Sequence, residues 1–201
     1  MVKVFYNNSS ICFRSKDNST DFENFQKVWE DGANIKVKEI LKTVEENDGK
    51  DFLILCSRPK ELLEYFKVYL NVINAGGGLV KNSKDQILFI YRLNKWDLPK
   101  GKANKNENIE DAALREVIEE TGIDSAKIIR QLTKTYHIYK LNNKRILKIS
   151  HWFEMSTGFK GELKPQASEN ITDAKWVDKK EFPLILSNSY GTIKELINFY
   201  Y

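Results

Sequence analysis

Three glutamates in the middle of the chain have the spacing needed to bind a metal ion together. Glu116, Glu119 and Glu120 stand at positions i, i+3 and i+4 of a segment with helical periodicity, so their carboxylates project from one helix face. Like charges at this spacing destabilise a helix unless a cation neutralises them. Carboxylate oxygens are hard ligands that suit Mg²⁺ or Mn²⁺. The triplet predicts a divalent metal site, although such a pattern is also typical of a solvated helix face.

The residues around the triplet favour the metal site. The predicted helix runs over about residues 109–121 and ends at Gly122, a residue that readily adopts a left-handed conformation. Arg115 lies beside the acidic face, and Glu107 in the preceding loop could hold it in a bidentate ion pair. Gly101 begins a lysine-rich turn in which the backbone can approach a ligand closely.

Residues 101–123 resemble the Nudix box, the signature of the Nudix hydrolase family, without a departure. The match consists of Gly101, five residues, Glu107, seven residues, Arg115-Glu116, an aliphatic residue, any residue, Glu119-Glu120, any residue, Gly122 and an aliphatic residue. The flanking segments AGGGLV and ITDAKWVD resemble the first strand and a late strand of the Nudix fold. The resemblance covers about residues 73–201.

The resemblance implies a chemistry for these side chains. Nudix hydrolases use metal-activated water to cleave a nucleoside diphosphate linked to another group, giving a nucleotide and a phosphorylated product. The three glutamates would bind the metal and act in catalysis, with the backbone at Gly101 completing the metal shell, and Arg115 and Glu107 would orient them. The general base would be Glu116 or Glu169, which lies where many members carry an additional carboxylate. Glu169 is equally typical of a surface charge.

Residues outside the box predict something about the substrate. The segment from Trp96 to Lys102 resembles the approach to the box in Nudix enzymes that act on dinucleoside polyphosphates and on diphosphorylated inositol phosphates. Tyr139 lies 16 residues beyond the box, where the dinucleoside polyphosphate group tends to carry a tyrosine, and it could stack on a base. Lys100, Lys102 and Lys148 could bind further phosphates. An ordinary strand tyrosine and solvated lysines are the alternatives.

Hydrophobic periodicity divides the chain into two predicted domains. Residues 1–72 are predicted to form a small α/β unit of unknown role. Its expected elements are strands at 2–6 and 10–14, a helix at about 21–30, a helix carrying Val37 to Val44, a strand at 51–56 and a helix from Pro59. The break in composition at Ala75–Gly78 is either a hinge or a place where the backbone comes close to the substrate.

Residues 73–201 are predicted to form an α+β domain, the α/β/α sandwich of the Nudix fold. Its expected elements are a hairpin at about 79–92, the box helix, strands near 128–140, 145–155 and 174–178, and a helix at about 192–199. These elements give a mixed sheet with a helix on each side.

The composition favours a protein that binds an anionic small molecule. The net charge is +4, and residues 73–201 hold the positive excess, with 21 Lys and Arg against 16 Asp and Glu. This excess suits a nucleotide but is too small to favour nucleic-acid binding. No apolar run approaches the length of a membrane span, and the first residues lack a signal-peptide pattern. We therefore expect a cytoplasmic protein without a membrane partner.

Two functions are open from the sequence. The first is a Mg²⁺- or Mn²⁺-dependent Nudix pyrophosphohydrolase that cleaves a nucleoside diphosphate derivative, for example a dinucleoside polyphosphate. The second is a non-catalytic nucleotide-binding module of Nudix fold, in which residues 1–72 serve as an effector or dimerisation part and give a homodimer. Because such modules usually lose box carboxylates, the intact box favours the enzyme.

Overall fold

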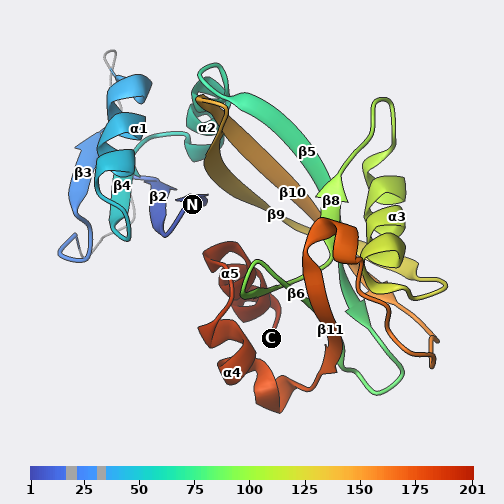
Figure 1. Ribbon diagram of the computed structural model, residues 1–201. Helices are drawn as coiled ribbons and strands as arrows, with labels where there is room; N and C mark the ends of the chain where they lie inside the picture. Colours follow the sequence, from blue (N-terminus) through green and yellow to red (C-terminus); the bar gives the residue numbers. More distant parts are fainter. Residues whose placement is uncertain (17–21, 31–34) are drawn as a thin grey trace. The chain divides into compact units, whose positions relative to one another are not determined.

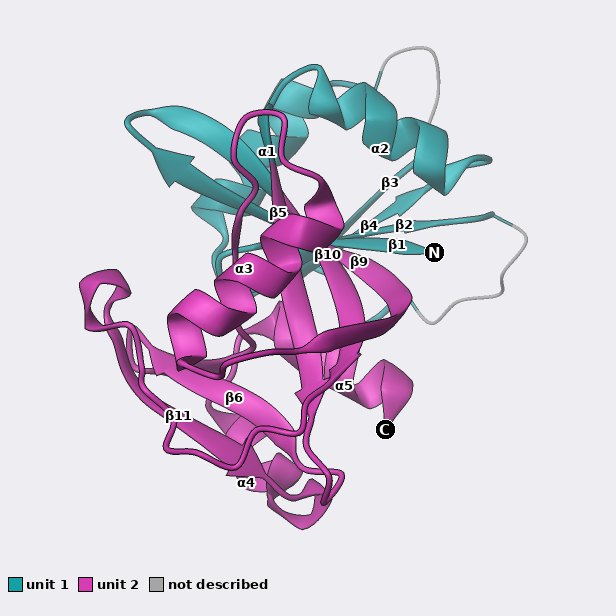
Figure 2. Cartoon of the chain, turned by 90° about the vertical axis from the view of Figure 1, so that its right-hand side faces the viewer, with its two compact units in different colours: residues 1–73, 136–148 teal, residues 74–135, 149–201 magenta. Residues whose placement is uncertain are grey.

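The computed structural model describes residues 1–16, 22–30 and 35–201, which form two compact units (Figure 1, Figure 2). Unit 1 consists of residues 1–73 and 136–148, and unit 2 consists of residues 74–135 and 149–201. Two long strands, β9 (Lys127–Leu141) and β10 (Lys144–Ser156), have residues in both units. The predicted domains differ from these units in the hairpin tip at 136–148, and their independence as folding domains stays a prediction.

Unit 1 is built from short strands and two helices. Its elements are β1 (Val2–Tyr6), β2 (Ser9–Arg14), β3 (Lys27–Glu30), α1 (Val37–Glu46), β4 (Asp51–Leu55) and α2 (Pro59–Lys67). The strands lie in the order β9–β1–β2–β4–β3, in which β1 and β2 are antiparallel and the other neighbours are parallel. The predicted hairpin, the buried strand and the helices that begin at Val37 and Pro59 are confirmed.

The helix predicted at about 21–30 is wrong over the residues that the structure describes, and Asp21 lies outside them. Residues 27–30 form β3, which pairs in parallel with β4. The Trp29 ring stacks on Phe52, with ring centroids 5.7 Å apart. The apolar spacing in this segment suits a helix, but Val28 and Trp29 also favour a strand, and pairing with β4 decides between the two.

Unit 2 contains the Nudix box. Its elements are β5 (Asn71–Lys81, of which residues 74–81 belong here), β6 (Ile87–Arg92), β7 (Lys95–Asp97), β8 (Lys100–Lys102), α3 (Ile109–Thr121), the 3₁₀ turn η1 (Ala167–Glu169), β11 (Ile171–Val177), the 3₁₀ turn η2 (Lys179–Glu181), α4 (Phe182–Ser187) and α5 (Gly191–Tyr200). The strands lie in the order β11–β6–β5–β10–β9, with β7 paired to β6 and β8 paired to β5. The predicted hairpin, box helix, later strands and C-terminal helix are confirmed. The sequence did not predict α4, in which Pro183 occupies the first turn, where its missing N–H is not needed.

Helices cover both faces of the unit 2 sheet, because neighbouring strand residues point to opposite sides. One layer packs α4 and α5 against Leu79, Ile87, Phe89 and Trp152. The other packs α3 against Val80, Leu88, Phe153 and Met155. Figure 1 shows α3 on one side and α4 and α5 on the other. The predicted α+β sandwich with a mixed sheet is confirmed. In the residues described here, no helix is long and apolar enough to cross a membrane.

The glycines at 76–78 lie inside strand β5 and bring the box helix close to the sheet. A Cβ atom at Gly76 would lie 2.6 Å from the backbone nitrogen of Ala113 and 2.6 Å from the carbonyl oxygen of Ile109. Any larger residue would push α3 outward. The position of the helix, and of the carboxylates it carries, therefore depends on this contact.

Candidate active site

Both ends of helix α3 are capped, which fixes where its glutamates project. The side chain of Asn108 accepts a hydrogen bond from the Glu110 amide, and Gly122 ends the helix in a left-handed conformation with φ of 72°. Within this frame Glu116 and Glu120 are buried, whereas the Glu119 side chain is 46% exposed.

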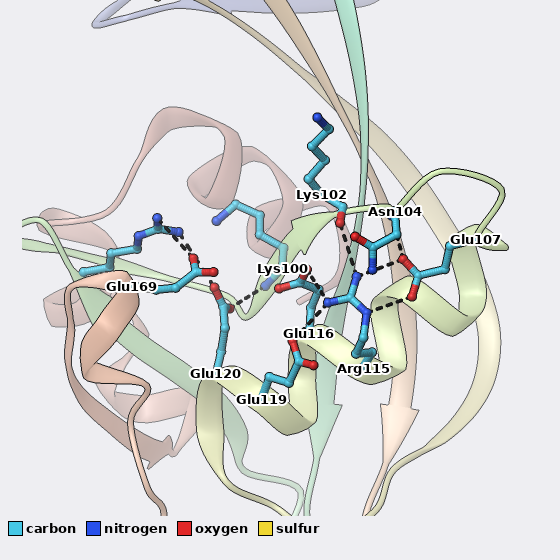
Figure 3. A network of polar contacts seen from close by, with 10 residues as sticks. Lys100, Lys102, Asn104, Glu107, Arg115, Glu116, Glu119, Glu120 and Glu169 are labelled. Atoms are coloured by element: carbon cyan, nitrogen blue, oxygen red, sulfur yellow. Dashed lines mark hydrogen bonds and ion pairs between the residues drawn. The ribbon is translucent and has the colours of Figure 1, made fainter.

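Arg115 is the centre of an ion-pair network along the box (Figure 3). Its Nε and Nη2 atoms donate to the two carboxylate oxygens of Glu107 at 2.7 and 2.9 Å, so the predicted bidentate pair forms. Its Nη1 atom donates to Glu116 at 2.7 Å and to Glu119 at 3.0 Å. The hydrogen bonds from Arg115 lower the pKa of Glu107 to about 2. One arginine therefore orients three carboxylates.

Glu120 is fully buried and only partly satisfied. One of its oxygens accepts a hydrogen bond from the Lys100 amide at 2.8 Å. The other, Oε1, has no hydrogen-bond partner among the described residues, and the nearest cation is Arg92, whose Nη1 atom lies 3.7 Å away. Burial raises the pKa of Glu120 to about 7, against the opposing effect of Lys100. A buried carboxylate oxygen without a donor is a favourable place for a cation.

Glu116 packs directly on the backbone of Gly101. A Cβ atom at position 101 would lie 1.9 Å from Glu116 Oε2, so only glycine leaves room for this carboxylate. Burial raises the pKa of Glu116, and Arg115 opposes that shift. The invariant glycine of the box pattern thus has a steric reason in this chain, because it brings backbone and carboxylate together.

Lys100 contributes its backbone to the site, while its side chain turns away to an ion pair. The ammonium group contacts the buried carboxylate of Asp97 and lies 3.4 Å from the carbonyl oxygen of Leu98. This pair fixes the turn whose amide reaches Glu120. Asp97 was not predicted as a site residue, although it lies in the segment from Trp96 to Lys102 that resembles the approach to the box.

Glu169, the acid predicted outside the box, lies at the end of η1 and joins the site through Arg92. The Nη2 atom of Arg92 lies 3.4 Å from Glu169 Oε2, while Nη1 faces Glu120. In Figure 3 the Glu169 and Glu120 carboxylates accordingly lie close together. Arg92 was not predicted from the sequence either, because an arginine at a strand end does not by itself indicate two acidic partners.

Among the predicted substrate-binding residues of unit 2, Lys100 and Lys102 meet the carboxylate network through their backbones, whereas the Trp96 side chain packs elsewhere. The Trp96 ring lies against Tyr91, with centroids 4.9 Å apart and ring planes tilted by 55°, and packs in the layer of α4 and α5. Lys102 is exposed, and Figure 3 shows its side chain pointing away from the glutamates. Tyr139 and Lys148 belong to unit 1. Their roles in binding stay predictions.

The oxygen donors of this site fit a divalent cation. In the described part of the chain, no group of three or more His, Cys, Asp or Glu side chains is arranged to hold a metal ion. Glu116 and Glu119 are instead paired with Arg115. Two observations nonetheless suit a cation: the buried Oε1 atom of Glu120 without a hydrogen bond, and the carboxylate of Glu116 against the open backbone at Gly101. Glu119 is exposed enough to turn toward the same place.

Comparisons with known proteins agree with this site. An RNA pyrophosphohydrolase of Bartonella clarridgeiae is 35% identical over 107 residues, which are 45% of this chain and 61% of that protein. A putative 8-oxo-dGTP diphosphatase of Bacillus subtilis is 32% identical over 110 residues, 54% of this chain and 68% of that protein. The chain therefore spans about three fifths to two thirds of the length of these curated relatives.

The fold is also found among solved structures. The crystal structure of a MutT protein from Methanosarcina mazei Go1 superposes with a TM-score of 0.50 at 24% identity, covering 65% of this chain and 93% of that one. The family model of the NUDIX domain matches residues 73–196, which is more than half of the chain and includes the whole box. The chain belongs to the NUDIX domain family.

Proposed function

We propose that this chain is a pyrophosphohydrolase that cleaves a diphosphate linkage in a nucleoside diphosphate derivative, giving a nucleotide and a phosphorylated product. The observation that carries the proposal is the gathering of the box carboxylates at one end of α3, with Glu116 and Glu120 buried and one oxygen of Glu120 left without a hydrogen bond. Membership of the NUDIX domain family and the names of the relatives support the same chemistry.

The metal would be Mg²⁺ or Mn²⁺, held by Glu116, Glu119 and Glu120 with the backbone at Gly101. When bound, a divalent cation would neutralise charge on the phosphoryl oxygens and make water a better nucleophile. The chain itself positions the ligands: Arg115 orients Glu116 and Glu119, and the Lys100 amide fixes Glu120. The glutamates can bind the metal and act in catalysis only while these hydrogen bonds hold them in place.

The proton acceptor from the attacking water would be Glu116 or Glu169. Glu116 is buried within the box, and its raised pKa brings it closer to neutral pH than an ordinary glutamate. Glu169 lies outside the box but reaches it through Arg92. Glu169→Gln separates the two, because Glu116→Gln also removes a metal ligand: a fall in kcat at saturating metal as large as that of Glu116→Gln would assign the base to Glu169, and an unchanged kcat would assign it to Glu116.

The substrate class is a finer proposal. Trp96, Lys100, Lys102, Tyr139 and Lys148 would bind the base and the outer phosphates of a dinucleoside polyphosphate or a diphosphorylated inositol phosphate. The Lys100 ammonium must leave Asp97 to do so. The names of the relatives add RNA and 8-oxo-dGTP as candidates.

A substrate panel with Mg²⁺ tests the proposal. It contains a dinucleoside tetraphosphate, ADP-ribose, 8-oxo-dGTP, a 5′-triphosphorylated RNA and a diphosphorylated inositol phosphate, and it compares wild type with Glu120→Gln. We expect turnover of at least one compound and a loss above about 100-fold in the variant, more than the 10–100-fold typical of residues that only support metal ligands.

Glu110→Gln, in the exposed first turn of the same helix, is the matched control and should keep wild-type rates. Equal rates for wild type and Glu120→Gln would contradict the proposal. Tight nucleotide binding by calorimetry with Mg²⁺, without turnover of any compound, would instead favour the non-catalytic module, with residues 1–72 as its effector or dimerisation part.

A further inference from the structure

Arg92 links the box to an acid that lies far from it in the sequence. Its guanidinium lies at the end of β6, where Nη1 is 3.7 Å from Glu120 Oε1 and Nη2 is 3.4 Å from Glu169 Oε2. Glu120 comes from α3 and Glu169 from η1, so two unconnected segments meet at this one side chain. The Arg92 side chain is only 28% exposed, which strengthens its interaction with both acids.

The segment that carries Glu169 has few other anchors to the box helix. The amide of Gln166 donates to the carbonyl oxygen of Glu120 at 3.2 Å, and the Lys164 amide donates to the carbonyl oxygen of Thr121. Both bonds hold the backbone before η1, but neither fixes the Glu169 side chain. Glu120 and Glu169 carry like charges, and Arg92 is the cation that faces both of them.

The ion pair of Arg92 with Glu120 contains buried polar atoms without hydrogen-bond partners. Among the described residues, three such atoms are found: Arg92 Nε, Glu120 Oε1 and Gln166 Oε1. Arg92 and Gln166 both contact Glu120 directly. Buried polar groups are nearly always satisfied in a purely structural arrangement. Two of the three atoms, Arg92 Nε and Glu120 Oε1, belong to one ion pair, which indicates an arrangement that other groups complete.

We propose that Arg92 is a positioning residue that holds Glu169 beside Glu120, so that the carboxylate outside the box takes part in the reaction. This inference deepens the proposed function and rests on it. Arg92 acts through Glu169, because its planar fork faces both acids at once. A lysine has a single point of charge and can hold only one of them well. The exposed pair of Arg130 with Glu154, elsewhere in unit 2, shows the ordinary arginine contact against which Arg92 can be compared.

Hydrogen exchange of the metal-free protein tests the positioning without requiring any activity. Wild type is compared with Arg92→Gln, Arg92→Lys and the control Arg130→Gln. We expect the amides of Glu169 and Asn170, which are bonded within η1, to exchange about 5–10 times faster in Arg92→Gln. Arg92→Lys should lie between, and Arg130→Gln should match wild type. Unchanged exchange in Arg92→Gln would overturn the inference even if the enzyme proves active.

Kinetics then show whether the positioning serves the reaction. Arg92→Gln and Glu169→Gln should each lower kcat about 10–100-fold with KM changed less than about threefold, as for residues around a metal ligand. If Arg92 acts through Glu169, the double variant loses no more than the worse single variant. Losses that multiply, or a change in KM alone, would overturn the inference. Partial recovery in Arg92→Lys would support it and would show that the fold is intact.

If no substrate turns over, the proposed function fails. The exchange experiment still decides whether Arg92 holds Glu169, so the two failures can be told apart.

Discussion

The molecule contains two clusters of charged side chains that are built in opposite ways. In the box cluster of unit 2, Arg115 is shared by three acids, and the fourth acid, Glu120, keeps one oxygen without a hydrogen bond. In unit 1 the single acid Glu45 is surrounded by donors. Its oxygens accept hydrogen bonds from Arg145 at 2.6 and 3.2 Å and from the Tyr6 hydroxyl at 2.6 Å, and Lys140 lies 2.7 Å away.

The two clusters shift the pKa of their buried acids in opposite directions. Burial alone would raise the pKa of Glu45, but hydrogen bonds from Arg145, Lys140 and Tyr6 lower it to about 2. Burial raises the pKa of Glu120 to about 7, because its partners do not compensate. A fully satisfied acid joins α1 to the hairpin tip at 136–148 within unit 1, whereas an unsatisfied one is typical of a functional site.

The largest effect on activity in this comparison is expected from a substitution at Gly101, beside the box cluster. In Gly101→Ala the new Cβ atom would meet Glu116, so the carboxylate must move by more than an ångström. We expect kcat/KM to fall about 100-fold, since displacement of that size at a reacting group can cost this much. Gly158→Ala is the matched control, because nothing lies within 4 Å of its added Cβ atom. Equal activity of the two variants would contradict the assigned geometry.

Glu45→Gln should instead change stability and leave the chemistry untouched. The charge of Glu45 is held by three donors at low exposure, and we expect the free energy of unfolding to fall by about 2 kcal/mol at pH 7. Urea denaturation measures the loss, and the exposed Glu39→Gln on the same helix should change it little. A loss equal to that of Glu39→Gln would show that the hydrogen bonds to Glu45 do not stabilise the fold.

The pH dependence of that loss follows from the sign of the pKa shift. Because the pKa of Glu45 is lower in the folded than in the unfolded state, its stabilising contribution is complete above the unfolded value of about 4.3. The contribution disappears as the pH falls from about 4.3 toward 2. The difference between wild type and Glu45→Gln should shrink over that range, and a constant difference would contradict the assignment.

The smallest effect is expected for Tyr6→Phe, which removes one of the donors to Glu45 and keeps the ring. A hydrogen bond to a charged group contributes about 1.5–3 kcal/mol, but this one is only partly buried and Arg145 and Lys140 still hold the acid, so we expect a loss of about 1 kcal/mol. Thermal unfolding would show it as a lower Tm. If Tyr6→Phe costs more than Glu45→Gln, the tyrosine has a packing role that the cluster does not explain.

Most of the fold could be predicted because local signals agreed with tertiary packing. The caps at Asn108 and Gly122 and the apolar face of α1 are properties of adjacent residues. The segment at 27–30 could not be placed this way. Its residues suit a helix or a strand, and it forms a strand because it pairs with the edge of β4.

The candidate site divides along the same line. The box pattern alone predicted the three glutamates and the pairing of Arg115 with Glu107, because all lie on one helix and the loop before it. Arg92 escaped prediction because its partners come from other segments. The sequence also could not show that the Lys100 ammonium turns to Asp97 while its amide serves Glu120.

By itself the sequence determined the type of site: spacing on a helix fixes which carboxylates share a face, and that spacing is a local property. Tertiary structure alone decided which of those carboxylates are buried, which oxygen lacks a donor and which arginine links Glu169 to Glu120. It also placed residues 136–148 in unit 1. These features depend on contacts between segments that are distant in the chain, and the energies of such contacts cannot be read from neighbouring residues.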